Sequence, residues 1–145
     1  MKIVKTLVTF ALLAYGTASL AADTLSQRIQ RHAPRGITAA FYSCIDQADT
    51  NAIGSGACLS AEKTRQDHRL NTAYQALLGK LDPKAKSALV IAEREWLKSQ
   101  DATGRFEDAL YGEESVANLE VSQNEIFRIC ERANAMEMYL SVASI

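Results

Sequence analysis

The scarcity of residues that form tight turns constrains this chain most. Its 145 residues include only seven glycines and two prolines, about half of the usual share. A β-sandwich needs a turn after each short strand, so this composition disfavours it. A disordered chain is also disfavoured, because 48% of the residues are hydrophobic. The sequence therefore favours long helices packed in a single globular domain.

The first 22 residues have the pattern of an export signal. Two early lysines precede a short apolar run (residues 7–14), and Ser19-Leu20-Ala21 has the small-x-small form of a cleavage site. A membrane anchor is the alternative, but the apolar run is too short to span a bilayer, and Asp23 stands where a lipoprotein needs cysteine. We expect cleavage after Ala21 or Ala22 and, in a Gram-negative host, a periplasmic protein. Residues 23–145 then form one domain.

Two short helices are expected at the start of the mature chain, over residues 24–32 and 38–46. Thr24 or Ser26 is the candidate cap of the first, and a break at residues 33–36 separates it from the second. A polar, glycine-containing loop should follow and reach Cys58.

The first long helix is expected to start at Ser60, which places Glu62 in its first turn, where the helix dipole favours a negative charge. Gly79 is a candidate residue just beyond its end, with Leu81 folding back over the helix. One apolar stripe runs along this helix at spacings of three and four residues. Its members are Leu70, Tyr74, Leu77, Leu78 and Leu81.

Two further long helices follow. Asp82 and Pro83 form a typical start for the first of these, which continues toward Leu110 with Gly104 as a candidate interruption. Because the link from the preceding helix is short, these two helices should pack antiparallel. After a break at Tyr111-Gly112, Glu113 and Glu114 open the last helix. Its stripe comprises Leu119, Ile126, Ile129 or Cys130, Ala133, Met136 and Leu140. The expected fold is an all-α bundle of about three long helices with a short, disulfide-tied N-terminal segment.

Three cysteines remain after removal of the export signal. Cys44 and Cys58 lie 14 positions apart in the sequence, and an oxidising compartment makes a disulfide between them the expected pairing. Cys130 is left over on what looks like the apolar face of a helix. It is expected to be a buried free thiol, with intermolecular pairing or a bond to one of the other two cysteines as the alternatives.

Charge is distributed unevenly. Residues 23–87 carry a net charge of +3 and residues 88–145 carry −6, and this negative charge disfavours nucleic acid as a partner. The densest acidic stretch has Arg105 as its only basic residue. Its members are Asp101, Glu107, Asp108, Glu113, Glu114, Glu120 and Glu125. Such a stretch is either a solvated helix face or a surface that steers a cationic partner.

No group of residues has the spacing of a known catalytic or metal site. His32 and His68 are the only histidines, and neither HExxH nor CxxC occurs. Gly54-Ser55-Gly56 lacks the glycine spacing of a nucleophile elbow. Glu93 and Glu95, two positions apart on a helix, point in nearly opposite directions. We therefore expect a protein that is not an enzyme and that uses no cofactor or metal.

Polar residues recur along the first long helix. Asp67, Asn71 and Tyr74 fall at positions i, i+4 and i+7, on one side of it. We interpret them as a hydrogen-bonded rim where two helices cross, with Trp96 as the large side chain that anchors the crossing.

These residues belong to two ordered patterns. Asp67 opens D-x-x-L-N-x-x-Y-x-x-L-x-x-x-L, and Leu89 opens L-x-x-A-E-R-E-W-L. Together they resemble the lysozyme inhibitor LprI-like N-terminal domain family. Its members have a Cys–Cys N-terminal segment, a D-x-x-L-N-x-x-Y-x-x-L helix and an A-Q-R-x-W-L helix followed by R-D and cysteine. The resemblance covers about residues 44–140. It gives Asp67, Leu70, Asn71, Tyr74, Leu81, Trp96 and Asp101 as family positions with a structural role.

The chain also departs from this family pattern. Glu93 stands where the family has Gln, and Gln100 stands before Asp101 where the family has Arg. Gly104 stands at the usual position of a third cysteine. The resemblance implies that the partner of that cysteine is the equivalent of Cys130, so one family disulfide would be lost here.

The founding activity of the family is inhibition of lysozyme. The resemblance therefore implies a non-catalytic, secreted or periplasmic protein that binds a cationic muramidase through its acidic surface. The alternative is a periplasmic immunity or adaptor protein that binds another toxin or envelope enzyme. The oligomeric state is left open by the sequence.

Overall fold

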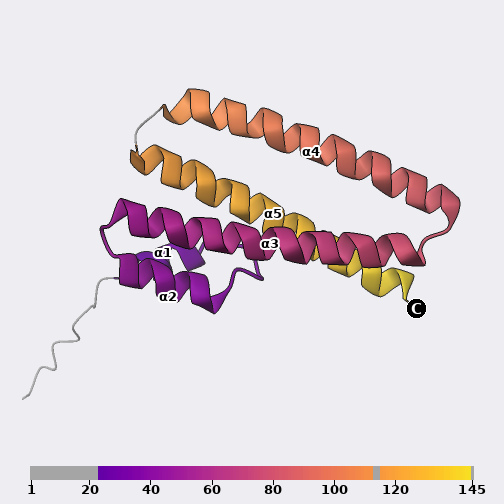
Figure 1. Ribbon diagram of the computed structural model, residues 1–145, viewed down its shortest axis with the longest axis horizontal. Helices are drawn as coiled ribbons and strands as arrows, with labels where there is room; N and C mark the ends of the chain where they lie inside the picture. Colours follow the sequence, from indigo (N-terminus) through magenta and orange to yellow (C-terminus); the bar gives the residue numbers. More distant parts are fainter. Residues whose placement is uncertain (1–22, 113–114, 145) are drawn as a thin grey trace, which may run out of the picture.

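The computed structural model describes residues 23–112 and 115–144, and this part of the chain is helical with short connections (Figure 1). The expected all-α fold with three long helices is confirmed. The export signal and the Glu113-Glu114 start of the last helix fall outside the described residues. The elements are α1 (Leu25–Gln30), α2 (Ala39–Ala48), α3 (Ala52–Lys80), α4 (Pro83–Tyr111) and α5 (Ser115–Ala143).

Side chains cap the starts of α1, α2 and α4, and at α1 and α4 the cap is one that the sequence predicts. The Thr24 hydroxyl accepts from the amide of Gln27 in a capping box at α1. The Thr38 hydroxyl accepts a hydrogen bond from an amide in the first turn of α2. The Asp82 carboxylate does the same at α4, where Pro83 occupies the first helical position.

The start of α3 corrects the prediction of a loop up to Cys58 and of a helix start at Ser60. The helix begins at Ala52, because the Asn51 side chain accepts hydrogen bonds from the amides of Ile53 and Gly54. The glycines allow close packing here: a Cβ on Gly54 would lie 3.2 Å from the Cβ of Ala48. Tertiary packing thus outweighs the low helix propensity of glycine.

Two other glycines were expected to end or interrupt helices, and they do not. Gly79 lies inside α3, which continues to Lys80, so the predicted glycine cap with Leu81 folded back is wrong. Gly104 lies inside a continuous α4. The chain leaves α4 at Gly112, whose positive φ of 77° favours glycine.

The core is divided into two clusters along α3 and α5. The first joins these helices to α2, and its buried members are Ile37, Phe41, Ile45, Cys58, Leu59, Ile126 and Cys130. The Cys44–Cys58 disulfide, with 5.7 Å between the two Cα atoms, links α2 to α3 and confirms the expected pairing. The second cluster lies further along the same two helices. Its buried members are Leu70, Ala73, Leu77, Ile129, Ala133 and Met136.

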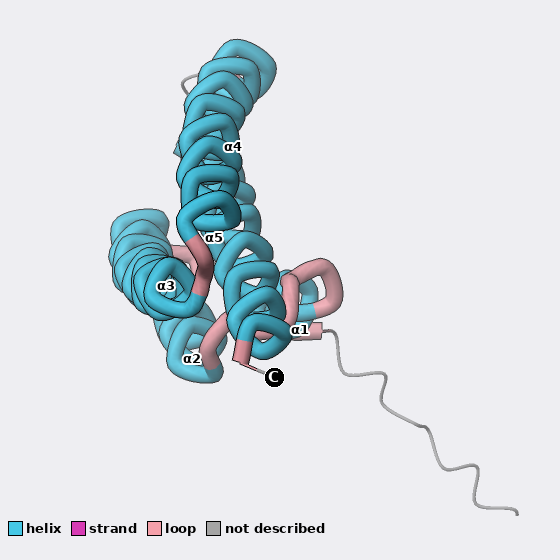
Figure 2. The backbone as a smooth tube through the Cα atoms, turned by 90° about the vertical axis from the view of Figure 1, so that its right-hand side faces the viewer, coloured by secondary structure: helices cyan, strands magenta, loops and turns pink. Residues whose placement is uncertain are grey.

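Helix α4 is attached differently. It runs antiparallel to α3, as expected, but it packs on α5 and not directly on α3 (Figures 1 and 2). Leu89 and Trp96 are partly buried against the second cluster, whereas Phe106 and Leu110 are each 62% exposed. Among the described helices, none is both long and apolar enough to cross a membrane. Because α4 diverges from α3, a groove lies between these two helices, and it contains the candidate site.

Candidate functional site in the groove between α3 and α4

A polar seam joins α4 to α5. The Arg132 guanidinium donates to Glu93 at 2.7 and 2.9 Å, and Arg128 donates to Glu107 at 2.8 Å and to Gln100 at 2.7 Å. Glu107 is only 9% exposed and is the one buried residue of α4. Charge-assisted hydrogen bonds from the two arginines therefore hold α4 in addition to the partly buried Leu89 and Trp96.

Trp96 lies at the middle of this seam. It packs against the second core cluster, and the guanidinium carbon of Arg132 lies 5.5 Å from its ring centroid. Arg132 thus contacts both an acid and an aromatic ring of α4. Trp96 thus joins α4 to the second core cluster, with α5 contributing the cation, and its predicted role as the anchor of a helix crossing stays a prediction.

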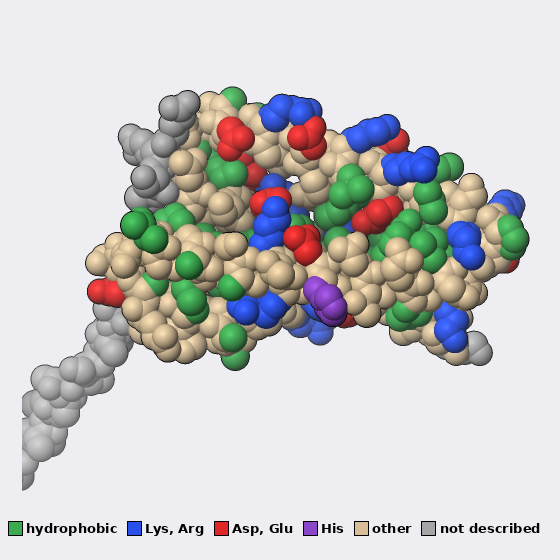
Figure 3. All heavy atoms as spheres, in the orientation of Figure 1, with side chains coloured by type: hydrophobic (Ala, Val, Ile, Leu, Met, Phe, Trp, Pro, Cys, Tyr) green, Lys and Arg blue, Asp and Glu red, His purple; other side chains and the backbone are tan. Residues whose placement is uncertain are grey.

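The family positions of α3 line a groove of about 460 Å³ that α4 and α5 complete. Figure 3 shows the molecule hollowed between α3 and α4, with hydrophobic side chains and both signs of charge in the hollow. The lining includes Asp67, Leu70, Asn71, Tyr74, Glu93, Trp96 and Gln100. The groove brings the two sequence patterns together on facing walls.

The predicted hydrogen-bonded rim is not what these residues form. The Asn71 amide donates to the backbone carbonyl of Asp67, within α3, at 2.9 Å. No hydrogen bond from Asp67, Asn71 or Tyr74 reaches α4 in the described part of the chain. The reason is the position of α4, which packs on α5 and so leaves this side of α3 open.

Asp67 is the electrostatically unusual residue of the groove. Desolvation raises the pKa of its carboxyl above the usual value; Lys63 acts in the opposite direction, and Glu125 adds to the rise. Lys63 is itself paired with Glu125 at 2.7 Å. Within residues 23–112 and 115–144, the Asp67 carboxylate has neither an ion pair nor a hydrogen bond.

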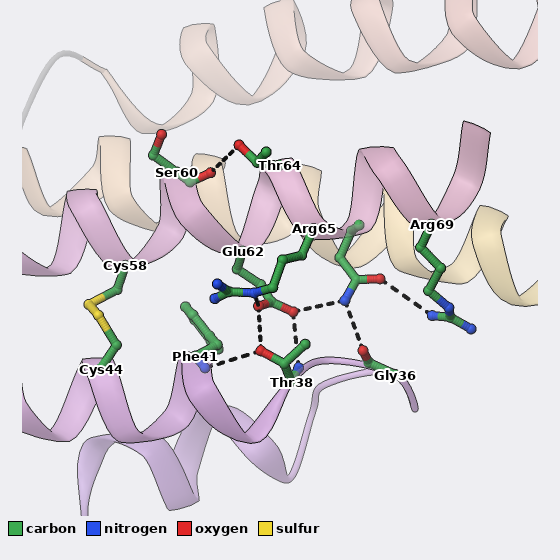
Figure 4. A network of polar contacts seen from close by, with 11 residues as sticks. Gly36, Thr38, Phe41, Cys44, Cys58, Ser60, Glu62, Thr64, Arg65 and Arg69 are labelled. Carbon is green, nitrogen blue, oxygen red and sulfur yellow. Dashed lines mark hydrogen bonds and ion pairs between the residues drawn. A yellow bond between two sulfur atoms is a disulfide. The ribbon is translucent and has the colours of Figure 1, made fainter. Parts of the chain in front are cut away.

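A second polar cluster, away from the groove, was missed by sequence reasoning (Figure 4). Glu62 is fully buried in the middle of α3 and not in a first turn. Its carboxylate accepts from the Thr38 amide at 3.0 Å and hydroxyl at 2.6 Å, from Gln66 at 2.8 Å and from Arg65 at 2.8 Å. These bonds tie the start of α2 to α3.

The pKa of Glu62 shows which effect dominates there. Burial pushes the pKa upward, but the hydrogen bonds from Thr38, Gln66 and Arg65 outweigh burial and lower it overall. Glu62 is therefore an ionised structural carboxylate. A usable signal existed: once the helix is extended back to Ala52, Glu62 falls on the same face as Leu59 and Leu70.

Cys130 is a buried free thiol, as expected. It donates to the backbone carbonyl of Arg35 at 3.3 Å, and burial raises its pKa although the nearby Arg69 acts in the opposite direction. Gly104 instead faces the side of α5 that carries Val121, Glu125 and Arg128. The pairing implied by the resemblance, between positions 104 and 130, therefore does not match this arrangement.

The acidic stretch does not form one free surface. Glu107 pairs with Arg128, Glu125 with Lys63 and Asp101 with Arg105. Asp108 and Glu120 are exposed, and Glu113 and Glu114 lie outside the described residues. The described members of this stretch present to solvent Asp101, Asp108 and Glu120, at one end of α4 and α5.

Neither histidine contributes to a chemical site in the described residues. His32 and His68 are both exposed, and no group of three or more His, Cys, Asp or Glu side chains there is arranged to hold a metal ion. The groove offers apolar and charged side chains and the unpaired Asp67 carboxylate, an arrangement that can bind a ligand.

Comparison with known proteins identifies the family. The family described as "Lysozyme inhibitor LprI" matches residues 44–137. The chain belongs to the LprI family. The matched segment contains both disulfide cysteines, the groove face of α3, the Trp96 seam and the Arg69–Glu137 ion pair. No curated protein and no solved structure matches the chain.

Proposed function

We propose that this LprI-family protein is an exported, non-catalytic inhibitor that binds lysozyme. The observation that carries the proposal is the family match, which spans residues 44–137 and therefore includes the whole groove. The name of the family supplies the activity, and the helical scaffold with an open groove is suited to gripping another macromolecule.

The charge of the protein supports a cationic partner. The C-terminal part, residues 88–145, carries a net charge of −6, and exposed carboxylates such as Asp108 and Glu120 lie on α4 and α5. Charges of this kind at a rim act mainly on the association rate and its salt dependence. Glu107 and Glu125 are already paired within the chain. The exposed carboxylates that remain would steer a cationic protein toward this one.

The location of the protein is part of the proposal. Residues 1–22 have the pattern of a cleaved export signal, and the Cys44–Cys58 disulfide suits an oxidising compartment. In a Gram-negative host this is the periplasm. The intact mass of the exported product should correspond to cleavage after Ala21 or Ala22, and retention of the full signal would contradict export.

A turbidity assay tests the inhibition. The mature protein, with its disulfide intact, is added to c-, g- and i-type lysozymes acting on bacterial cell walls, at low and at physiological salt. We expect inhibition of at least one class, weaker at the higher salt. No inhibition of any class at micromolar excess and low salt would refute the proposal, and a pull-down from envelope extract would then test the immunity or adaptor alternative.

A further inference from the structure

The charges in the groove between α3 and α4 are balanced except at two positions. Glu93 on α4 pairs with Arg132, and Glu125 on α5 pairs with Lys63. Asp67 on α3 and Arg94 on α4 have no such partner in the part of the chain that the structure describes. They differ in setting, because Arg94 is exposed and Asp67 is partly buried.

An unpaired, partly buried carboxylate is costly for a folded protein. Desolvation disfavours its charged form, and this is the main cause of the raised pKa of Asp67. The fold gains nothing visible in return, since the side chain neither caps a helix nor bonds to a neighbour. A group kept in such a state is a candidate for an interaction that a ligand completes.

The surroundings of Asp67 define what that ligand carries. Tyr74 lies two helical turns further along the same face of α3, and Trp96 and Leu97 lie on the opposite wall. A long side chain with an apolar stem and a cationic end fits walls of this kind, because its stem contacts the apolar residues and its charge reaches the acid.

We propose that this groove receives a lysine or arginine side chain from a loop of a protein partner, with the Asp67 carboxylate as its counter-charge. The proposal rests on the proposed function and deepens it, because it names the groove as the contact that follows electrostatic steering. The steering carboxylates and the groove then have separate roles, one in the association rate and the other in the lifetime of the complex.

A neutral sugar fits the groove less well. A sugar ring stacks on an aromatic face, and one face of Trp96 is already covered by Arg132, whose guanidinium carbon lies 5.5 Å from the ring centroid. A sugar would also leave the Asp67 charge uncompensated. A basic side chain supplies the missing positive charge directly, and its guanidinium or ammonium group donates the hydrogen bonds that this carboxylate lacks.

The decisive variant is Asp67→Asn. Because the carboxylate makes no hydrogen bond or ion pair with the described residues, this change removes the charge and little else. We expect the variant to unfold at a higher temperature than the parent protein and to bind its cationic partner at least about tenfold more weakly. A gain in stability combined with a loss of binding marks a binding group, whereas a merely structural residue would lose both.

Arg94→Gln is the matched control, since it removes the unpaired charge of opposite sign from the same groove. If a basic side chain enters, this variant binds the cationic partner as tightly as the parent or more tightly. Weaker binding by Arg94→Gln together with unchanged binding by Asp67→Asn would overturn the proposal, because the groove would then prefer an anion.

A direct test does not need lysozyme. Trp96 is the only tryptophan of the chain and lines the groove, so its fluorescence reports occupancy. The probes are a capped tripeptide with a central arginine, its twin with a central glutamine, and an N-acetylglucosamine trimer. We expect only the arginine peptide to change the emission, and we expect Asp67→Asn to abolish the change.

The outcomes separate the two proposals. If the arginine peptide binds through Asp67 but no lysozyme is inhibited, the groove inference stands and the proposed function fails. If lysozyme is inhibited equally by the parent and by Asp67→Asn, the function stands and the groove inference fails. An emission change with the sugar trimer or the glutamine peptide equal to that with the arginine peptide would also overturn the inference.

Discussion

Helices α3 and α4 have the same length, 29 residues, and yet they are held by opposite means. Eight residues of α3 are buried, including Leu59, Leu70 and Leu77, whereas α4 buries Glu107 alone. A disulfide and a buried carboxylate fix α3 to α2, while arginines of α5 hold α4. One chain thus combines a rigid frame, formed by α2, α3 and α5, with a more loosely attached wall, helix α4.

The difference has a consequence for motion. A helix with few buried apolar contacts opens locally at low free energy, so α4 should move relative to the α3–α5 frame without unfolding it. The groove lies between this wall and that frame. We expect its width to adapt to a partner at little cost, which is compatible with the proposed entry of a basic side chain.

The largest expected loss of stability comes from a change in the frame. Glu62→Ala removes the acceptor of the Thr38 amide and hydroxyl and leaves a cavity in a fully buried site. We expect a loss of about 4 kcal/mol in the free energy of unfolding, measured in urea. Glu95→Ala, at an exposed i,i+3 pair with Lys98, is the control and should change stability by less than about 0.5 kcal/mol. Equal effects would contradict the buried network.

The contribution of Glu62 to stability should also depend on pH. Because hydrogen bonds lower the pKa of Glu62 in the folded state, its contribution is present above the unfolded pKa and is lost as the pH falls through the folded pKa. We expect Glu62→Gln to make unfolding less dependent on acid below about pH 4.5. A pH profile identical to that of the parent protein would contradict a lowered pKa of Glu62 in the folded state.

The second effect also acts on the frame. Replacing Cys44 and Cys58 with serine opens a link between positions 14 apart, and we expect a loss of about 3 kcal/mol. Hydrogen exchange should show that α2 loses more protection than α4 does. The native parent protein should react with a thiol reagent only after unfolding, because Cys130 is buried. Equal losses in α2 and α4 would mean that the two regions unfold as one.

A smaller effect separates the wall from the frame. Arg128→Ala removes the ion-pair partner of Glu107 and the hydrogen-bond donor to Gln100, and leaves Glu107 with Asn124 at 3.3 Å. We expect α4 to open more easily by about 2 kcal/mol. Amide exchange should accelerate along α4 and stay unchanged in the second core cluster of α3 and α5. If exchange accelerates equally in α3, the seam is part of the global core and the comparison fails.

The smallest effect has the opposite sign. A Cβ on Gly104 would meet nothing within 4 Å in the middle of α4, so Gly104→Ala should stabilise this helix by about 0.5–1 kcal/mol. Gly36→Ala, in the connection between α1 and α2, is the contrasting variant, since Gly36 has a φ of 108° and a Cβ there would collide with Arg69. The midpoint temperature of thermal unfolding should rise for Gly104→Ala and fall for Gly36→Ala. A lower midpoint for Gly104→Ala would show that this position is packed.

The sequence predicts local features of single helices better than it predicts which helices pack together. Caps such as Asp82-Pro83 and the regular apolar stripe of α5 depend on neighbouring residues, so local patterns are enough to find them. The start of α3 was misplaced because the glycines near Ser55 have low helix propensity, and the helix there is explained by the Asn51 cap together with the close approach of Gly54 to Ala48. Propensity is outweighed wherever two elements approach this closely.

The site was predicted only in part. Spacing placed Asp67, Asn71 and Tyr74 on one face of a helix, and this is where they lie. The contacts of that face depend on which helix covers it, and no local pattern encodes that α4 packs on α5. The pairing of Arg132 with Glu93 joins residues 39 positions apart, a distance at which one sequence shows no signal. The unpaired state of Asp67 follows from the same arrangement and became visible only in the structure.

Hydrogen exchange of the mature protein with and without a c-type lysozyme tests the central claim most directly. We predict that lysozyme protects the amides of α4 and of the α3 segment from Asp67 to Tyr74, that it leaves the α2–α3 junction unchanged, and that Asp67→Asn greatly reduces this protection. Protection confined to α1 and α2, or no protection by any lysozyme that the protein inhibits, would contradict the groove as the binding site.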